Sequence, residues 1–213
     1  MTTRIAVVAA NGKAGSLIVK EAVERGLDVT AVVRGENRTA AANAIVKDLF
    51  DLTAADLAGF DVVIDAFGAW TEDTLPQHST TLNHLADILA GTDTRLLVVG
   101  GAGSLYMDAD HTLQLSQTEG FPESYLPLAT AMGEALAELR ERADVKWTYV
   151  SPAADFQADG ERTGAYTLAG EEFTVNENGE SAVSYADYAV AMVDEALASP
   201  ADAHVGERIS VRW

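Results

Sequence analysis

Short apolar runs rich in β-branched residues alternate along the chain with longer amphipathic segments. The short runs are typical of buried strands, and the longer segments are typical of helices that cover a sheet. We expect strands at 4–9, 28–33, 44–49, 61–66, 95–100, 146–150 and near 207–212. Helices are expected at 13–25, about 73–91, 126–142 and 185–198, with helical turns near 39–43 and 53–58. This order predicts an α/β fold with a doubly wound, mostly parallel sheet.

The length of 213 residues fits a single domain, 1–213, with a substantial core. From residue 151 to 184 the pattern changes to Gly, Asp, Glu and Thr, with two short β-like runs at 165–168 and 172–175. About 30 residues cannot form a core of their own. We therefore predict a small hairpin excursion on the substrate side of the domain, in place of a second domain.

The first forty residues carry the most specific motif. A buried strand, Ile5–Val8, leads into a small-residue turn and a helix, and a second strand ends at Val33. This is the first half of a dinucleotide-binding βαβ unit, in which a helix N-terminus binds pyrophosphate. The turn residues expected to contact the cofactor are Ala9, Asn11, Gly12, Lys13, Ala14 and Gly15. A connection of small residues that binds nothing is the alternative.

Ala9 stands where the usual fingerprint has its first glycine, whereas Gly12 and Gly15 keep the G-x-x-G spacing. A left-handed conformation costs an alanine about 1–2 kcal/mol. We therefore expect a negative φ at Ala9.

The formal net charge of −19 argues against nucleic-acid partners and fits a surface adapted for solubility or salt tolerance. Against this background Lys13, Arg34 and Arg38 all fall at the predicted cofactor end. Arg34 follows the second strand, where NAD-preferring folds carry an acid for the ribose hydroxyls. A guanidinium there suits a 2′-phosphate, so we predict NADP(H) in preference to NAD(H). The alternative is that Arg34 is a solvated loop arginine.

The rest of the site is expected outside the carboxyl ends of the strands. Asp48 and Leu49 follow the third strand and would lie at the adenine edge. The further cofactor contacts expected after the fourth and sixth strands are Phe67, Gly68 and Pro152, and the expected substrate contacts are Trp70, Ser104 and Phe156. The aromatic residues could form a floor for a planar substrate, and simple packing is the alternative.

Several features limit the function classes. Cysteine is absent, which excludes disulfides and thiol chemistry and fits a reducing cytoplasm. No apolar run approaches 18 residues, and the early first strand leaves no room for a signal peptide, so we expect a cytoplasmic protein without membrane contact. His78 and His84 are six positions apart, which is not a metal-ligand spacing, and no metal site is expected. The expected partner is a small-molecule substrate, and the oligomeric state stays open.

Seven segments spread over the chain resemble the atypical short-chain dehydrogenase/reductases, most closely the NmrA-like, NAD(P)H-binding group described as NADH-flavin reductases. They are Ala9–Gly15, Val33–Arg34, Asp65–Gly68, Leu97–Ser104, Trp147–Pro152, Arg162–Tyr166 and Gly179–Ala189. The resemblance implies one Rossmann-like domain with a small C-terminal, substrate-side lobe. It also implies an NAD(P)H-dependent oxidoreductase.

The catalytic residues are not identified by this resemblance. Ordinary short-chain dehydrogenases use Tyr-x-x-x-Lys, but here Tyr125 is followed four positions later by Ala129. Tyr125 and Ser104 are the candidates, with a surface tyrosine and a helix-capping serine as the alternatives. His111 lies in the same loop region, where a solvated side chain is more usual than a catalytic one.

The missing tyrosine–lysine pair suits a reaction that needs no proton donor from the protein. Hydride transfer from NADPH to a flavin depends mainly on stacked, dry geometry. The leading hypothesis is therefore NADPH-dependent reduction of a flavin or another planar acceptor. A redox-sensing regulator that binds NADP(H) without turnover, and an atypical epimerase or reductase of a small carbonyl compound, are the alternatives.

Overall fold

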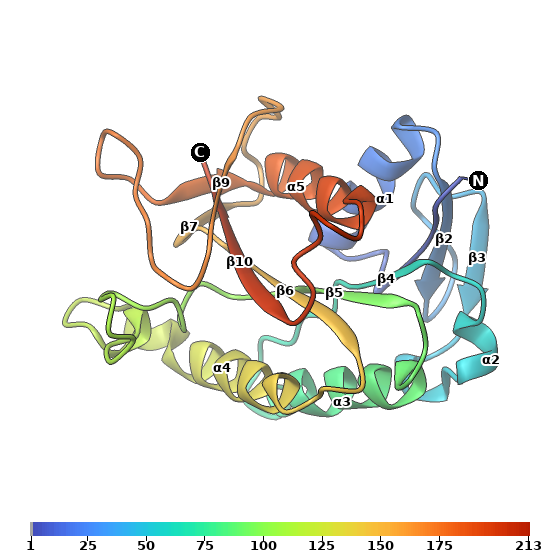
Figure 1. Cartoon of the computed structure of the whole chain (residues 1–213), viewed down its shortest axis with the longest axis horizontal. Helices are drawn as coiled ribbons and strands as arrows, with labels where there is room; N and C mark the ends of the chain where they lie inside the picture. Colours follow the sequence, from blue (N-terminus) through green and yellow to red (C-terminus); the bar gives the residue numbers. More distant parts are fainter. Residues whose placement is uncertain (1) are drawn as a thin grey trace.

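The computed structural model describes residues 2–213, with an eight-stranded sheet at its centre (Figure 1). The strands lie in the order β3-β2-β1-β4-β5-β6-β10-β8, and every neighbouring pair is parallel except β10 and β8. Their bounds are β1 Arg4–Val8, β2 Asp28–Val33, β3 Asn43–Val46, β4 Val62–Asp65, β5 Arg95–Val99, β6 Lys146–Pro152, β8 Thr167–Ala169 and β10 Glu207–Arg212. The predicted doubly wound, mostly parallel α/β sheet is confirmed.

Helices cover both faces of this sheet (Figure 1). On one face α1, Lys13–Glu24, packs against α5, Tyr185–Leu197, and on the other α3, Gln77–Leu89, packs against α4, Leu126–Arg140. Successive strand side chains point to opposite faces, so β1 contributes alternate residues to two separate cores. This double burial explains why the strands are continuously apolar. None of the helices in residues 2–213 is long and apolar enough to cross a membrane.

The strand order reverses between β1 and β4. From β1 the chain proceeds outward to β2 and β3, and from β4 it proceeds the other way to β5 and β6. In open parallel sheets the ligand crevice lies outside the carboxyl ends of the strands at such a reversal. The turn after β1 and the loop after β4 therefore border the expected site.

Two predicted helical segments differ from the structure. The chain at 39–43 forms no helical turn, because the Asn37 carboxamide holds the segment open by donating to Ala41 O and accepting from Thr39 N. Helix α3 begins only at Gln77, after Pro76, where about residue 73 was expected. The predicted helical turn near 53–58 is present as α2, Ala54–Leu57.

The excursion from 151 to 184 does not form the predicted hairpin. Its first β-like run becomes β8, which pairs with β10, while Glu172 bridges to Tyr106. A later strand, β9 Ala182–Ser184, pairs in parallel with β7, Asp155–Gln157. A segment with no core of its own has to form its backbone hydrogen bonds with other parts of the fold. This explains why its two β-like runs pair with different segments and not with each other.

Candidate functional site

The turn after β1 adopts the geometry of the glycine fingerprint although its first position is alanine. Ala9 has φ +56°, so the prediction of a negative φ there is wrong. Its carbonyl oxygen accepts a hydrogen bond from Gly12 N at 2.9 Å, which closes the turn. The closure imposes a left-handed conformation that costs about 1–2 kcal/mol for alanine. Backbone strain is thus held at this turn.

Gly15 allows α1 to approach this turn closely. A Cβ at position 15 would lie 2.8 Å from Ala9 O and 3.0 Å from Ala10 Cα, both main-chain atoms. Helix α1 begins after Gly12, which offers no side-chain cap, and the first helical turn carries no acidic residue. The first amides of a helix lack intrahelical partners and favour anions. This helix end is therefore suited to a pyrophosphate.

Three basic side chains differ from the others because they have no ion-pair or hydrogen-bond partner within residues 2–213. Of the 14 lysines and arginines, all except Lys13, Arg34 and Arg38 make an ion pair or a side-chain hydrogen bond within residues 2–213. Lys13 opens α1, and Arg34 and Arg38 are exposed just beyond the end of β2. In a chain with net charge −19, three unpaired cations around one turn favour a ligand with several negative charges.

Three of the expected cofactor residues make contacts within the fold. Asn11 turns its carboxamide toward the loop that follows β2, with bonds to Glu36 O and Arg38 N. After β3, Leu49 is buried in the core, and the Asp48 carboxylate accepts from Phe50 N to cap a short helical turn. The adenine-edge role predicted for Asp48 and Leu49 stays a prediction.

The loop after β4 lies over a buried acid that the sequence analysis did not assign to the site. Asp65 is 4% exposed, and its carboxylate accepts from Phe67 N at 3.0 Å. Burial raises the pKa of Asp65 to about 6. The available signal was Asp65 itself, which comes directly after the apolar residues Val62–Ile64.

The expected residues of this loop take different positions. The Phe67 ring packs edge-on against His78 with 5.8 Å between the ring centres, and His78 Nε2 lies 3.1 Å from Ala69 O. A Cβ on Gly68 would lie 3.5 Å from the indole nitrogen of Trp70, whose side chain is mostly exposed. His78 is thus bound to backbone. Residues 2–213 contain no cluster of side chains suited to a metal ion.

Ser104 anchors the long loop after β5. Its Oγ and its carbonyl oxygen each accept a hydrogen bond of 2.9 Å from the buried Arg208 of β10. Arg208 also pairs with Glu171, so the guanidinium joins two loops to the sheet. Ser104 is therefore neither a helix cap nor an exposed hydroxyl. Sequence reasoning could not find Arg208, which lies 104 positions away.

The other substrate-side candidates lie apart. Tyr125 precedes α4 and is exposed. Ala129 packs closely against Gly103, since a Cβ added to Gly103 would lie 2.6 Å from the Cβ of Ala129. Phe156 lies 3.8 Å from Tyr185, measured between ring centres. Within residues 2–213 the rings of Phe67, Trp70 and Phe156 form no pairs with one another.

Pro152 and His111 both take part in the packing of the fold. Pro152 is buried as the last residue of β6. His111 has φ +55°, stacks on Tyr106 and pairs with Glu172 at 2.7 Å. His111 therefore joins its loop to the excursion.

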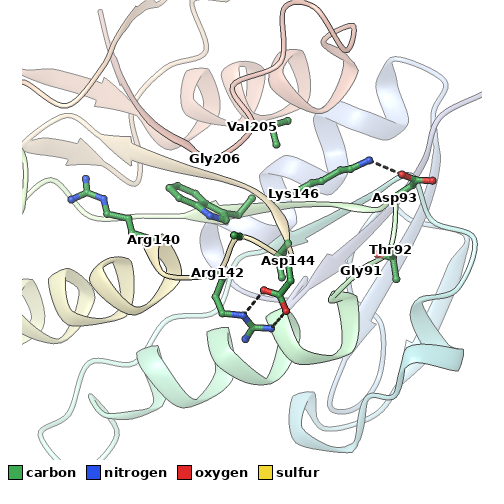
Figure 2. A pocket seen from close by; sticks show the side chains of 12 residues that line it. Gly91, Thr92, Asp93, Arg140, Arg142, Asp144, Lys146, Val205 and Gly206 are labelled. Atoms are coloured by element: carbon green, nitrogen blue, oxygen red, sulfur yellow. Dashed lines mark hydrogen bonds and ion pairs between the residues drawn. The ribbon is translucent and has the colours of Figure 1, made fainter.

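A hollow of about 550 Å³ lies at the opposite, amino-terminal end of the strands (Figure 2). Figure 2 shows Lys146 pointing to Asp93 and Arg142 to Asp144, at 2.6 and 2.8 Å. Arg142 also pairs with Asp87. The cations of this hollow are neutralised by the protein itself, which leaves no charge to attract an anionic ligand.

Comparisons with known proteins cover nearly the whole chain. A family model described as NAD(P)H-binding matches residues 9–197. The uncharacterized protein YwnB of Bacillus subtilis (strain 168) is 44% identical over 211 residues, covering 98% of this chain and 97% of YwnB.

Two crystal structures are also similar over their whole length. A Streptococcus pneumoniae protein provisionally named a NADH-flavin reductase is 55% identical, with a TM-score of 0.95 and 99% of both chains covered. A Bacteroides thetaiotaomicron protein provisionally named an epimerase is 34% identical, with a TM-score of 0.84 and 100% and 98% covered.

Proposed function

Because the chain belongs to the NAD(P)H-binding family, we propose that it is an oxidoreductase that takes its hydride from NADPH in preference to NADH. The observation that carries this proposal is the group of unpaired cations, Lys13, Arg34 and Arg38, around the turn after β1. The turn and the start of α1 suit the pyrophosphate that both nucleotides share. The cations suit the extra phosphate of NADPH.

Arg34 is the main determinant of this preference. It stands beyond the end of β2, at the position where a carboxylate would bind the ribose hydroxyls of NADH. Its guanidinium has no carboxylate partner in residues 2–213 and can therefore form bidentate hydrogen bonds with a phosphate. Arg38 adds a second positive charge four positions later. An acidic protein surface makes such a local cluster necessary for binding a polyanion.

The proposed hydride acceptor is a flavin or another planar compound. Tyr125 has Ala129 in place of the lysine that would lower the tyrosine pKa, and the Ser104 hydroxyl is bound to Arg208. The packed rings of Phe156 and Tyr185 are partly exposed and supply aromatic contact area for a planar acceptor on the substrate side. The bound nicotinamide would supply the hydride, while the protein orients the two rings and excludes water. The name given to the Streptococcus pneumoniae relative supports the same acceptor class.

A regulator that binds NADP(H) without turnover is the second candidate. The absence of a lysine four positions after Tyr125, which supports a flavin acceptor, also favours this candidate. The two proposals differ in whether bound NADPH is consumed.

Stopped-flow oxidation of NADPH with FMN, riboflavin and a quinone separates them. Turnover with at least one acceptor supports the reductase, whereas tight binding without oxidation supports the regulator. The variant Arg34→Glu is expected to weaken NADPH binding about 10- to 100-fold and NADH binding less than about threefold. Lys20→Glu is the matched control, since it makes the same charge change on the exposed side of α1. Equal losses for both nucleotides in Arg34→Glu would contradict the preference.

A further inference from the structure

Asn11 lies at the centre of the phosphate turn, yet its side chain bonds to another segment. Its Nδ2 donates to Glu36 O at 2.8 Å, and its Oδ1 accepts from Arg38 N at 2.9 Å. Both partners are main-chain atoms of the loop that follows β2. A carboxamide can donate two hydrogen bonds and accept two, and this pair of bonds uses one of each kind.

The loop beyond β2 is organised by a second asparagine. Asn37 Nδ2 donates to Ala41 O at 2.8 Å, and its Oδ1 accepts from Thr39 N and Thr39 Oγ1. Asn37 thus fixes the loop internally. Within residues 2–213, the only hydrogen bonds between the turn at 9–15 and the loop at 34–41 come from Asn11.

We propose that Asn11 is a positioning residue for cofactor selectivity, because its carboxamide fixes the loop carrying Arg34 and Arg38 at a set distance from the pyrophosphate turn. This inference rests on the proposed preference for NADPH. The pyrophosphate and the 2′-phosphate of NADPH are attached to the same ribose, so the distance between them varies only within a narrow range. Binding groups already held at that spacing need less ordering when the ligand binds. NADH lacks the 2′-phosphate and gains little from this arrangement.

The variant Asn11→Ala tests the inference by titration calorimetry with NADPH and with NADH. We expect NADPH affinity to fall about tenfold and NADH affinity less than about threefold, as for the loss of about one net hydrogen bond. Asn83→Ala is the matched control, since it removes a carboxamide that donates to Glu138 between α3 and α4.

A double-mutant cycle separates positioning from general support of the turn. In the background Arg34→Ala/Arg38→Ala, the change Asn11→Ala should alter NADPH affinity less than about threefold, because Asn11 acts through those two residues. A full tenfold additional loss there, or an equal loss for NADH in the single variant, overturns the inference. Asn11→Ser, whose side chain is too short for both bonds, replaces the alanine variant if the latter does not fold.

The wild-type titration keeps the two proposals distinguishable. If the wild-type protein prefers NADPH and Asn11→Ala preserves the full preference, the inference fails and the proposed function stands. If the wild-type protein shows no preference for NADPH, the proposed specificity fails first and the inference falls with it.

Discussion

The two ends of the central sheet differ in how their charges are satisfied. At the amino end Arg142 and Lys146 border a hollow of about 550 Å³, and each faces a carboxylate of the protein. At the carboxyl end Lys13, Arg34 and Arg38 surround the phosphate turn without such partners in residues 2–213. The comparison teaches that unsatisfied charge, and not the volume of a hollow, distinguishes the end suited to an anionic cofactor.

Two buried acids repeat this contrast. Near the amino end Glu195 is 5% exposed and is bound by Arg95 and His204. At the carboxyl end Asp65 is equally buried, and its carboxylate accepts a hydrogen bond from an uncharged amide, Phe67 N. Glu195 is therefore paired with the guanidinium of Arg95. Asp65 is held in surroundings that disfavour ionisation.

Gly15→Val should have the largest effect on the carboxyl end. The new side chain would press on main-chain atoms of Ala9 and Ala10, which cannot yield as a flexible side chain would. We expect NADPH affinity to fall at least about 1000-fold, equivalent to about 4 kcal/mol. Titration calorimetry measures this loss. The control Gly133→Ala meets only Ser104 Cβ at 3.7 Å and should bind normally; near-normal binding by Gly15→Val would contradict the role of the turn.

Glu195→Gln should destabilise the amino end. It leaves the guanidinium of Arg95, whose Nε already lacks a partner, without its carboxylate. Removing one partner of a buried ion pair typically costs about 3–5 kcal/mol. Urea denaturation monitored by circular dichroism gives the change in the free energy of unfolding. The exposed Glu177→Gln serves as the control, and equal stability of the two variants would refute the contrast.

Asp65→Asn should act in the opposite direction. The folded protein holds the Asp65 proton up to about pH 6, whereas the unfolded chain loses it near 3.8. The wild-type protein therefore loses stability as the pH rises through this window, by up to about 3 kcal/mol for a shift of about two pKa units. The asparagine variant should be more stable than wild type at pH 7.5, and the difference should vanish near pH 4. A difference that stays constant between pH 4 and 8 would contradict the raised pKa.

The smallest effects should come from single lysines at the two ends. Lys13→Ala removes an unpaired cation and should weaken NADPH binding about fivefold. Lys146→Ala removes a cation already paired with the fully exposed Asp93 and should change NADPH affinity less than about twofold. Parallel titrations of the two variants give the comparison directly. Equal losses would show that charge pairing does not distinguish the ends.

The sequence was sufficient for the order of the helices and of the parallel strands, because the central strands are continuous apolar runs between amphipathic segments. It did not predict β7 and β9 in the excursion. It was not sufficient for the conformation of Ala9. Local preference favours a negative φ for alanine, but the close approach of α1 at Gly15 and the hydrogen bond from Gly12 override it.

Hydrogen bonds between residues distant in sequence could not be predicted either. The burial of Ser104 depends on Arg208, and the orientation of Asn11 depends on main-chain atoms at 36 and 38. No local pattern specifies such contacts, because they arise when the strands assemble. Asp65 is different, since its place directly after the apolar residues Val62–Ile64, at the carboxyl end of an expected strand, marks it as a site candidate from the sequence alone.

The most direct test of the account is calorimetric titration of the wild-type protein with NADPH and with NADH at low and high salt. The unpaired cations predict binding of both nucleotides, a higher affinity for NADPH, and a preference that shrinks as salt screens the charges. No heat with either nucleotide, or tighter binding of NADH, would contradict the central claim that the carboxyl end of the sheet binds a phosphorylated nicotinamide cofactor.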